Sequence, residues 1–151
     1  MSSYGRGATQ TLYVERTQVL ADGSDADWKT GGVTIDWPTV TAPVADVTLA
    51  DGEVIPAGTK FIAFGETLAR ITASGKFGLH RTDALDGRQN RVAGDCYVIN
   101  KTVREDEDAS DHPGVFDGGR VWEARLVAGG ANQATLAQIK AAFPRLSYAK
   151  D

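Results

Sequence analysis

The stretch that decides the fold reads VIPAGTKFIAFG and runs from Val54 to Gly65. It holds two short apolar runs separated by the turn Pro56–Gly58, where proline suits the first corner of a type I turn and glycine its exit. The second run, Lys60–Phe64, is rich in aromatic and β-branched side chains, as a buried strand is. This strand–turn–strand pattern predicts a fold built from short strands joined by turns.

Similar short strands are predicted on both sides of this stretch. Upstream, residues 33–37 alternate between apolar and polar, which places Val33, Ile35 and Trp37 on one face. Downstream, the turn Ser74-Gly75 separates two further short apolar runs. The other predicted strands cover residues 46–49, 68–71, 76–79, 96–103 and 120–126, the last of them after a turn at 117–119.

Only the end of the chain has a helical pattern. Residues 135–138 read Thr-Leu-Ala-Gln, a capping box in which the Thr135 hydroxyl and the Gln138 side chain satisfy free N–H groups at a helix start. Leu136, Ile139 and Phe143 follow at spacings of three and four, so they form one apolar stripe. A short helix is therefore predicted, ending before the proline at position 144.

The composition fits one domain of 151 residues with a real core. Hydrophobic residues make up 42% and charged residues 24%, the usual globular mix, and 17 glycines suit many turns. We predict a mainly β protein, a compact barrel- or sandwich-like domain at 33–151 that ends in the short helix. Residues 1–32 are predicted to be a flexible arm followed by a polar loop at 22–27.

Charge and patterning exclude several classes of function. The net charge of −4 disfavours a nucleic-acid partner, which requires a basic patch. No apolar run reaches the length of a membrane span, and the first residues lack the apolar core of a signal peptide. The single cysteine, Cys96, excludes an intrachain disulfide and a thiolate zinc cluster. We expect a protein with neither a nucleic-acid nor a membrane partner.

No set of residues forms a convincing catalytic or metal-binding pattern. The chain has two histidines, His80 and His112, and Cys96 heads a strand-like run where a buried, inert thiol is expected. The acidic residues 105–111 do not follow a calcium-binding loop and are interpreted as a solvated loop. We therefore expect a protein that is not an enzyme and uses no metal or cofactor; an enzyme using Cys96 and a histidine is the least favoured alternative.

The tryptophans leave a second alternative open. Trp37 and Trp122 lie on the apolar faces of predicted strands and are expected in the core. Trp28 follows a polar segment and is the better candidate for a contact residue. A carbohydrate- or ligand-binding β module of a phage fibre or tail, using Trp28, is the alternative function.

Several short motifs, taken in order, resemble the head decoration (capsid cement) proteins of tailed bacteriophages. The resemblance covers roughly residues 54–143. Its motifs are Ile55–Thr59, Gly75–Phe77, Leu85–Gly87, Ala93-Gly94, Val98–Val103, Gly118–Val121 and Phe143-Pro144.

The resemblance implies a β-rich homotrimer that binds the outer surface of the expanded head and stabilises contacts between capsomers. Its partner would be the major capsid protein, and its location the outside of the virion after synthesis in the host cytoplasm. The N-terminal arms of such proteins become ordered on the capsid, where an added strand extends a sheet of the capsid protein. The residues expected to contact the capsid are Tyr4, Leu12, Tyr13 and Val14.

Overall fold

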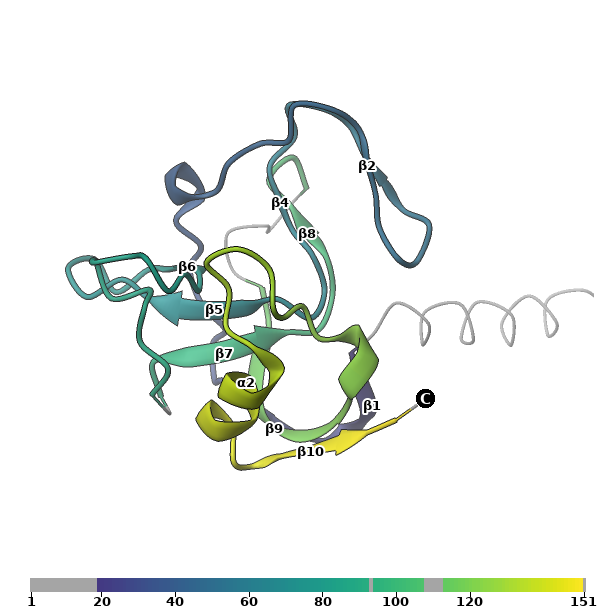
Figure 1. The fold of residues 1–151 in the computed structure, drawn as a ribbon, viewed down its shortest axis with the longest axis vertical. Helices are drawn as coiled ribbons and strands as arrows, with labels where there is room; N and C mark the ends of the chain where they lie inside the picture. Colours follow the sequence, from purple (N-terminus) through teal and green to yellow (C-terminus); the bar gives the residue numbers. More distant parts are fainter. Residues whose placement is uncertain (1–18, 93, 108–112, 151) are drawn as a thin grey trace, which may run out of the picture.

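The protein is mainly β, with one short helix near its C-terminus (Figure 1). The structure is a computed structural model and describes residues 19–92, 94–107 and 113–150. A six-stranded sheet forms its centre, in the order β1-β9-β7-β5-β6, with β10 pairing with β9. Its strands are β1 (Leu20–Trp28), β5 (Thr67–Arg70), β6 (Phe77–Leu79), β7 (Cys96–Ile99), β9 (Val115–Trp122) and β10 (Leu146–Ala149).

Two small sheets and three short helical segments complete the described chain. The β2–β3 hairpin projects from one end of the molecule, and α2, β9 and β10 lie toward the other (Figure 1). The small sheets pair β2 (Val47–Thr48) with β3 (Val54–Ile55), and β4 (Phe61–Ile62) with β8 (Val103–Arg104). The helical segments are the 3-10 turns η1 (Trp37–Thr39) and η2 (Glu123–Arg125) and the helix α2 (Leu136–Ala142).

Both faces of the central sheet are covered. Side chains alternate along β7, so Cys96 and Val98 join one buried cluster while Tyr97 and Ile99 join the other. The first cluster includes Ile139 and Phe143 from the helical end of the chain, and the second includes residues from the 33–40 segment. The sheet is thus the middle layer, which is why all four residues of β7 are buried.

The elements that depend on local sequence agree with the predictions. A turn forms at this place but one residue later than predicted: the N–H of Thr59 donates to the carbonyl of Pro56 at 3.2 Å, so Gly58, with a φ of 85°, is its second corner and not its exit. The hairpin of β5 and β6 turns at Gly75, whose φ is 75°. The capping box is formed as predicted: the Thr135 hydroxyl accepts from the Gln138 N–H at 3.2 Å. The hairpin turn at Gly75 and the capping box are confirmed, whereas the turn at Gly58 is confirmed in place but not in type.

The 33–37 segment has the predicted burial pattern but does not form the predicted strand. Val33, Ile35 and Trp37 are all buried on the face that the alternation indicates. However, only Ile35 makes a β-bridge, parallel to Phe77, and Trp37 begins η1. The segment therefore covers the sheet rather than forming a full strand in it.

The polar loop predicted at residues 22–27 is wrong, because these residues belong to β1. The strand pairs antiparallel with β9: Asp22 pairs with Arg120 and Asp27 with Gly118, and the register shifts between these two pairs. The turn predicted at 117–119 is also wrong, since Gly118 and Gly119 lie inside β9. A Cβ on Gly118 would collide with the Asp27 carboxylate, so this glycine permits the close approach of β1. The pattern typical of a turn here marks a tight strand contact.

Three further differences come from long-range pairing. The run 96–103 is broken at Asn100 into β7 and β8, which belong to different sheets. The strand predicted at 120–126 ends at Trp122, and η2 follows it. β10 was not predicted, and it pairs parallel with the second half of β9, from Gly119 to Trp122. The first half of β9 pairs with β7 instead, so β9 joins two parts of a curved sheet (Figure 1).

Candidate binding surface

The chain enters its central sheet at a firmly held point, Val19. This residue is fully buried, and its N–H donates to the side-chain oxygen Oδ1 of Asn100 at 2.9 Å. The same oxygen accepts from the N–H of Leu20 at 3.0 Å, and the carbonyl of Val19 accepts from the N–H of Trp122 at 2.9 Å. Asn100 is itself 5% exposed, so these bonds form in the interior. Buried hydrogen bonds between neutral groups are costly to break, because the donors and acceptors that lose their partners cannot reach water.

The strand that begins here lies at an edge of the sheet. Within the described residues β1 pairs only with β9, so its other side has no β partner. An edge strand presents backbone N–H and C=O groups that can pair with another chain. Of the predicted capsid-contacting residues, Tyr4, Leu12, Tyr13 and Val14 all lie outside the described residues. They precede this edge strand in the sequence.

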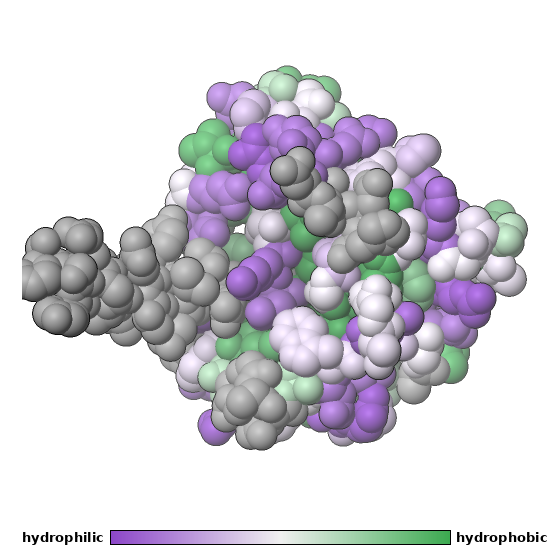
Figure 2. Space-filling model, turned by 180° about the vertical axis from the view of Figure 1, so that it is seen from behind, coloured by the Kyte–Doolittle hydropathy of each residue, from purple (hydrophilic) through white to green (hydrophobic). Residues whose placement is uncertain are grey.

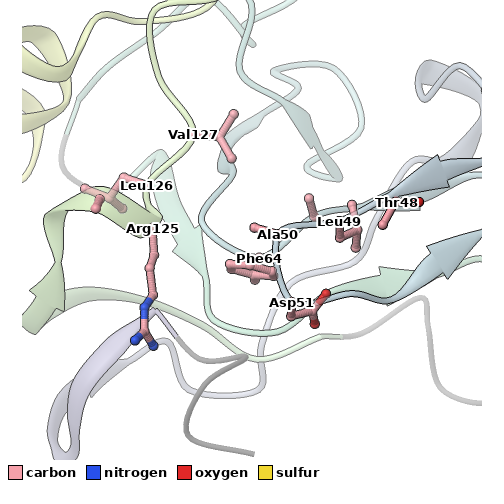
Figure 3. A pocket seen from close by; sticks show the side chains of 10 residues that line it. Thr48, Leu49, Ala50, Asp51, Phe64, Arg125, Leu126 and Val127 are labelled. Atoms are coloured by element: carbon pink, nitrogen blue, oxygen red, sulfur yellow. The ribbon is translucent and has the colours of Figure 1, made fainter. Parts of the chain in front are cut away.

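An apolar groove of about 400 Å³ lies between the β2–β3 hairpin and the segment after β9 (Figure 3). Phe64 lies in the middle of the lining, with residues 48–51 on one side and residues 125–127 on the other. Leu49, Leu126 and Val127 are among the other apolar residues of the lining. The charged groups of the lining are Asp51 and Arg125, and the Arg125 guanidinium lies 5.5 Å from the centre of the Trp122 ring.

Gly65 allows one wall of this groove to approach the rest of the molecule. The N–H of Val127 donates to the carbonyl of Gly65 at 3.0 Å. Gly65 has a φ of 85°, and a Cβ at this position would overlap the backbone carbonyl of Arg125. The groove therefore depends on a residue that has no side chain. The mostly apolar lining of the groove suits an apolar side chain or a short extended segment.

The potential catalytic residues are not arranged for catalysis in the described chain. Cys96 is fully buried, and burial raises the pKa of its thiol to about 11, so the thiol stays protonated at neutral pH. Its Sγ contacts the carbonyl oxygen of Val92 at 3.4 Å. Burial also lowers the pKa of His80, and its Nε2 lies 3.3 Å from the Gln89 carbonyl oxygen. His112 lies outside the described residues.

Charged side chains in the described ranges form ion pairs with one another and do not gather into a metal-binding cluster. No three of their His, Cys, Asp and Glu side chains are grouped as a metal site would require. In the acidic loop, Glu105, Asp106 and Glu107 are exposed. The Arg104 guanidinium donates to Asp106 at 2.9 Å, and the Arg104 N–H donates to Glu107 at 2.9 Å. The rest of the acidic loop, from residue 108, lies outside the described residues.

The three tryptophans differ in exposure. Trp37 is in the core, as predicted, but Trp122 is only partly buried, which corrects its assignment to the core. Trp28 is 46% exposed and packs edge-on against Phe116, with the ring centres 5.7 Å apart. On the face seen in Figure 2, hydrophobic residues are mostly interspersed among hydrophilic ones. The exposure of Trp28 leaves its ring accessible, and its role as a contact residue stays a prediction.

Sequence reasoning missed two features. One is the buried start of β1 at Val19, which we call the root of β1, and the other is the groove. The one local signal for the root is Asn100, a polar residue that follows the apolar run of β7. The groove has no local signal, because it is lined by three segments far apart in the sequence.

Comparison of the chain with protein-family models, with curated proteins and with solved structures found no match. None of the helices in the described ranges combines the length and the apolarity needed to cross a lipid bilayer.

Proposed function

We propose that this protein is a capsid decoration protein of a tailed bacteriophage. It binds the outer surface of the expanded head as a homotrimer and stabilises contacts between capsomers. The observation that carries the proposal is the entry of the chain into its sheet through the edge strand β1, held at Val19 by Asn100. Strand-forming residues of the preceding segment are therefore tethered to a fixed point at the sheet edge.

The reach of this segment suits contact with a neighbouring subunit. Val14 lies five positions before Val19, so it is at most about 17 Å from the root when the chain is extended. Leu12 and Tyr13 lie only slightly further along. A strand formed by these residues adds backbone hydrogen bonds to a sheet edge of the capsid protein, with their side chains filling apolar pockets.

Attachment through several arms explains how weak contacts hold a shell together. In a trimer, binding of one arm raises the effective concentration of the other two at their sites. The ordering cost of each arm is paid at binding, so a single arm binds weakly. The mechanism uses buried area and strand pairing, and no substrate is transformed.

The test compares the full chain with a variant that lacks residues 1–14, using expanded shells that carry no decoration protein. We expect the truncated protein to lose binding in a co-sedimentation assay, while light scattering still gives the mass of a trimer. The double variant Leu12→Asp, Val14→Asp should bind as poorly as the truncation, because charged side chains cannot enter apolar pockets.

The matched control is Thr9→Asp, Thr11→Asp, which adds the same charge at polar positions of the same segment. It should keep most of the binding. Full occupancy by the truncated protein would rule out the arm mechanism, and a monomeric mass for the full chain would rule out the trimer.

A second candidate function is a carbohydrate-binding module, favoured by the 46% exposure of Trp28. An exposed indole ring offers an apolar face with a polar N–H group. Titration with simple sugars should then quench tryptophan fluorescence in the full chain and not in Trp28→Ala. Unchanged fluorescence throughout would exclude this alternative.

A further inference from the structure

A small polar cavity lies between the central sheet and the region around α2. Its volume is about 10 Å³, and it is lined by polar residues at the start of β5 and just after β6 and by residues of the 127–139 region. The polar residues are Glu66, Thr67, His80 and Gln133. One water molecule requires about 10–15 Å³ of such space and two to four polar partners. The cavity thus has the size and the lining of a site for one water.

Two of these side chains present unsatisfied polar atoms. Thr67 is 7% exposed and His80 is 5% exposed. Within the described part of the chain, neither Oγ1 of Thr67 nor Nδ1 of His80 has a hydrogen-bond partner. Buried polar atoms without a partner are rare, because burial removes their hydrogen bonds to water and no other hydrogen bond compensates for the loss. Both atoms belong to residues that line the same cavity.

The backbone brings these two residues together. The N–H of His80 donates to the carbonyl of Thr67 at 2.9 Å, continuing the pairing of β5 with β6. The other ring nitrogen of His80, Nε2, lies 3.3 Å from the carbonyl of Gln89. A carbonyl only accepts, so Nε2 carries the proton and Nδ1 of the neutral ring is an acceptor. The Thr67 hydroxyl, in contrast, can donate as well as accept.

We propose that one ordered water molecule occupies this cavity, accepting a hydrogen bond from the Thr67 hydroxyl and donating one to Nδ1 of His80. Glu66 and Gln133 line the same cavity and supply polar groups for the second proton of the water. The water is an integral part of the fold and is independent of the capsid-binding proposal.

The direct test is a crystal structure of the full chain at a resolution that shows ordered water. We expect density for one water within hydrogen-bond distance of Oγ1 of Thr67 and Nδ1 of His80. In solution, the nitrogen chemical shifts of His80 should report a neutral ring protonated on Nε2. Density showing a direct bond between the Thr67 hydroxyl and Nδ1 would overturn the proposal, as would a ring protonated on Nδ1.

The variant Thr67→Val gives an independent test, because the expected sign depends on the water. Valine has the shape of threonine without the hydroxyl. If the water is bound, the variant removes one of its partners and the midpoint of thermal unfolding falls. If the cavity is dry, the variant removes an unsatisfied hydroxyl and the midpoint rises. Thr48→Val, at an exposed position of β2, measures the effect of valine in a strand by itself. A midpoint for Thr67→Val at or above that of this control would overturn the proposal, and if the variant does not fold, the crystal structure still decides.

Discussion

The side-chain oxygen of Asn100 accepts the N–H of Val19 at 2.9 Å, across 81 residues of sequence. The contact joins the start of the described chain to the point where β7 ends. It fixes the place from which the N-terminal segment departs, and it does so inside the core. The free energy of unfolding should therefore depend on the Asn100 side chain.

The variant Asn100→Ala should lower the free energy of unfolding by about 2–4 kcal/mol. It leaves the N–H groups of Val19 and Leu20 buried without an acceptor, and each such group carries a desolvation penalty. Urea denaturation followed by tryptophan fluorescence measures the change. The control Asn90→Ala, at an exposed position, should stay within about 0.5 kcal/mol of the parent. An equally small loss for Asn100→Ala would mean that the root is not held by this side chain.

Gly65→Ala should destabilise the protein more than Gly58→Ala. Both glycines have a φ of 85°, so both variants carry the same backbone penalty, about 1–2 kcal/mol. At Gly58 a Cβ meets open space, whereas at Gly65 it overlaps the carbonyl of Arg125. The difference between the two free energies of unfolding measures the close contact that forms the groove. Equal losses would contradict the close approach of η2 to Gly65.

The stability of the protein should depend on Glu66 between about pH 4.5 and 7. Burial raises the pKa of this carboxyl from 4.5 to about 7, so the folded state holds a proton that the unfolded state has lost. The free energy of unfolding contributed by this group therefore falls as pH rises through this window, by up to about 3 kcal/mol. Glu66→Gln removes the dependence and should be more stable than the parent at pH 8.

Two neighbouring effects must be separated from that of Glu66. Burial lowers the pKa of His80, so its contribution to stability is lost as pH falls below 6.5, the opposite direction. Subtracting the pH profiles of the two proteins removes the part of the His80 contribution that Glu66 does not influence. Glu123→Gln is the matched control, because the hydrogen bond from Lys140 lowers the pKa of Glu123 and its contribution is lost on acidification. A difference between parent and Glu66→Gln that does not vary with pH would show that Glu66 is not buried.

Cys96 should not react with a thiol reagent in the folded protein. Its side chain is fully buried and its thiol has a pKa of about 11, so little thiolate is present or accessible at pH 8. Labelling with a chromogenic disulfide should require urea and follow unfolding. The variant Val44→Cys, at a fully exposed position, provides a thiol that reacts at once. Rapid reaction of Cys96 in the absence of urea would contradict its burial.

Local sequence was sufficient for the features that depend on neighbours in the chain. The capping box of Thr135 and Gln138 forms because its two partners are three residues apart. The turn at Gly58 forms because glycine adopts its positive φ without steric cost. The alternation of Val33, Ile35 and Trp37 predicted their burial, since the face on which a side chain lies follows from the geometry of an extended chain.

Pairing between distant segments could not be predicted in this way. Gly118 has the signature of a turn, yet it lies in β9, where Asp27 of β1 occupies the space that a side chain would fill. β10 was missed because its partner strand lies more than twenty positions earlier. The groove beside Phe64 and the polar cavity beside His80 each combine segments from separate parts of the sequence.

The sequence by itself determined the β-rich character, the places of the turns at Gly58 and Gly75, the short helix and the absence of a disulfide framework. The tertiary structure alone decided that residues 20–28 form the edge of the sheet, that Asn100 holds their start, and which polar atoms are buried together. The physical reason is the range of the interactions. Backbone preferences and capping act over a few residues, whereas sheet register and burial depend on which distant side chains fill the same space.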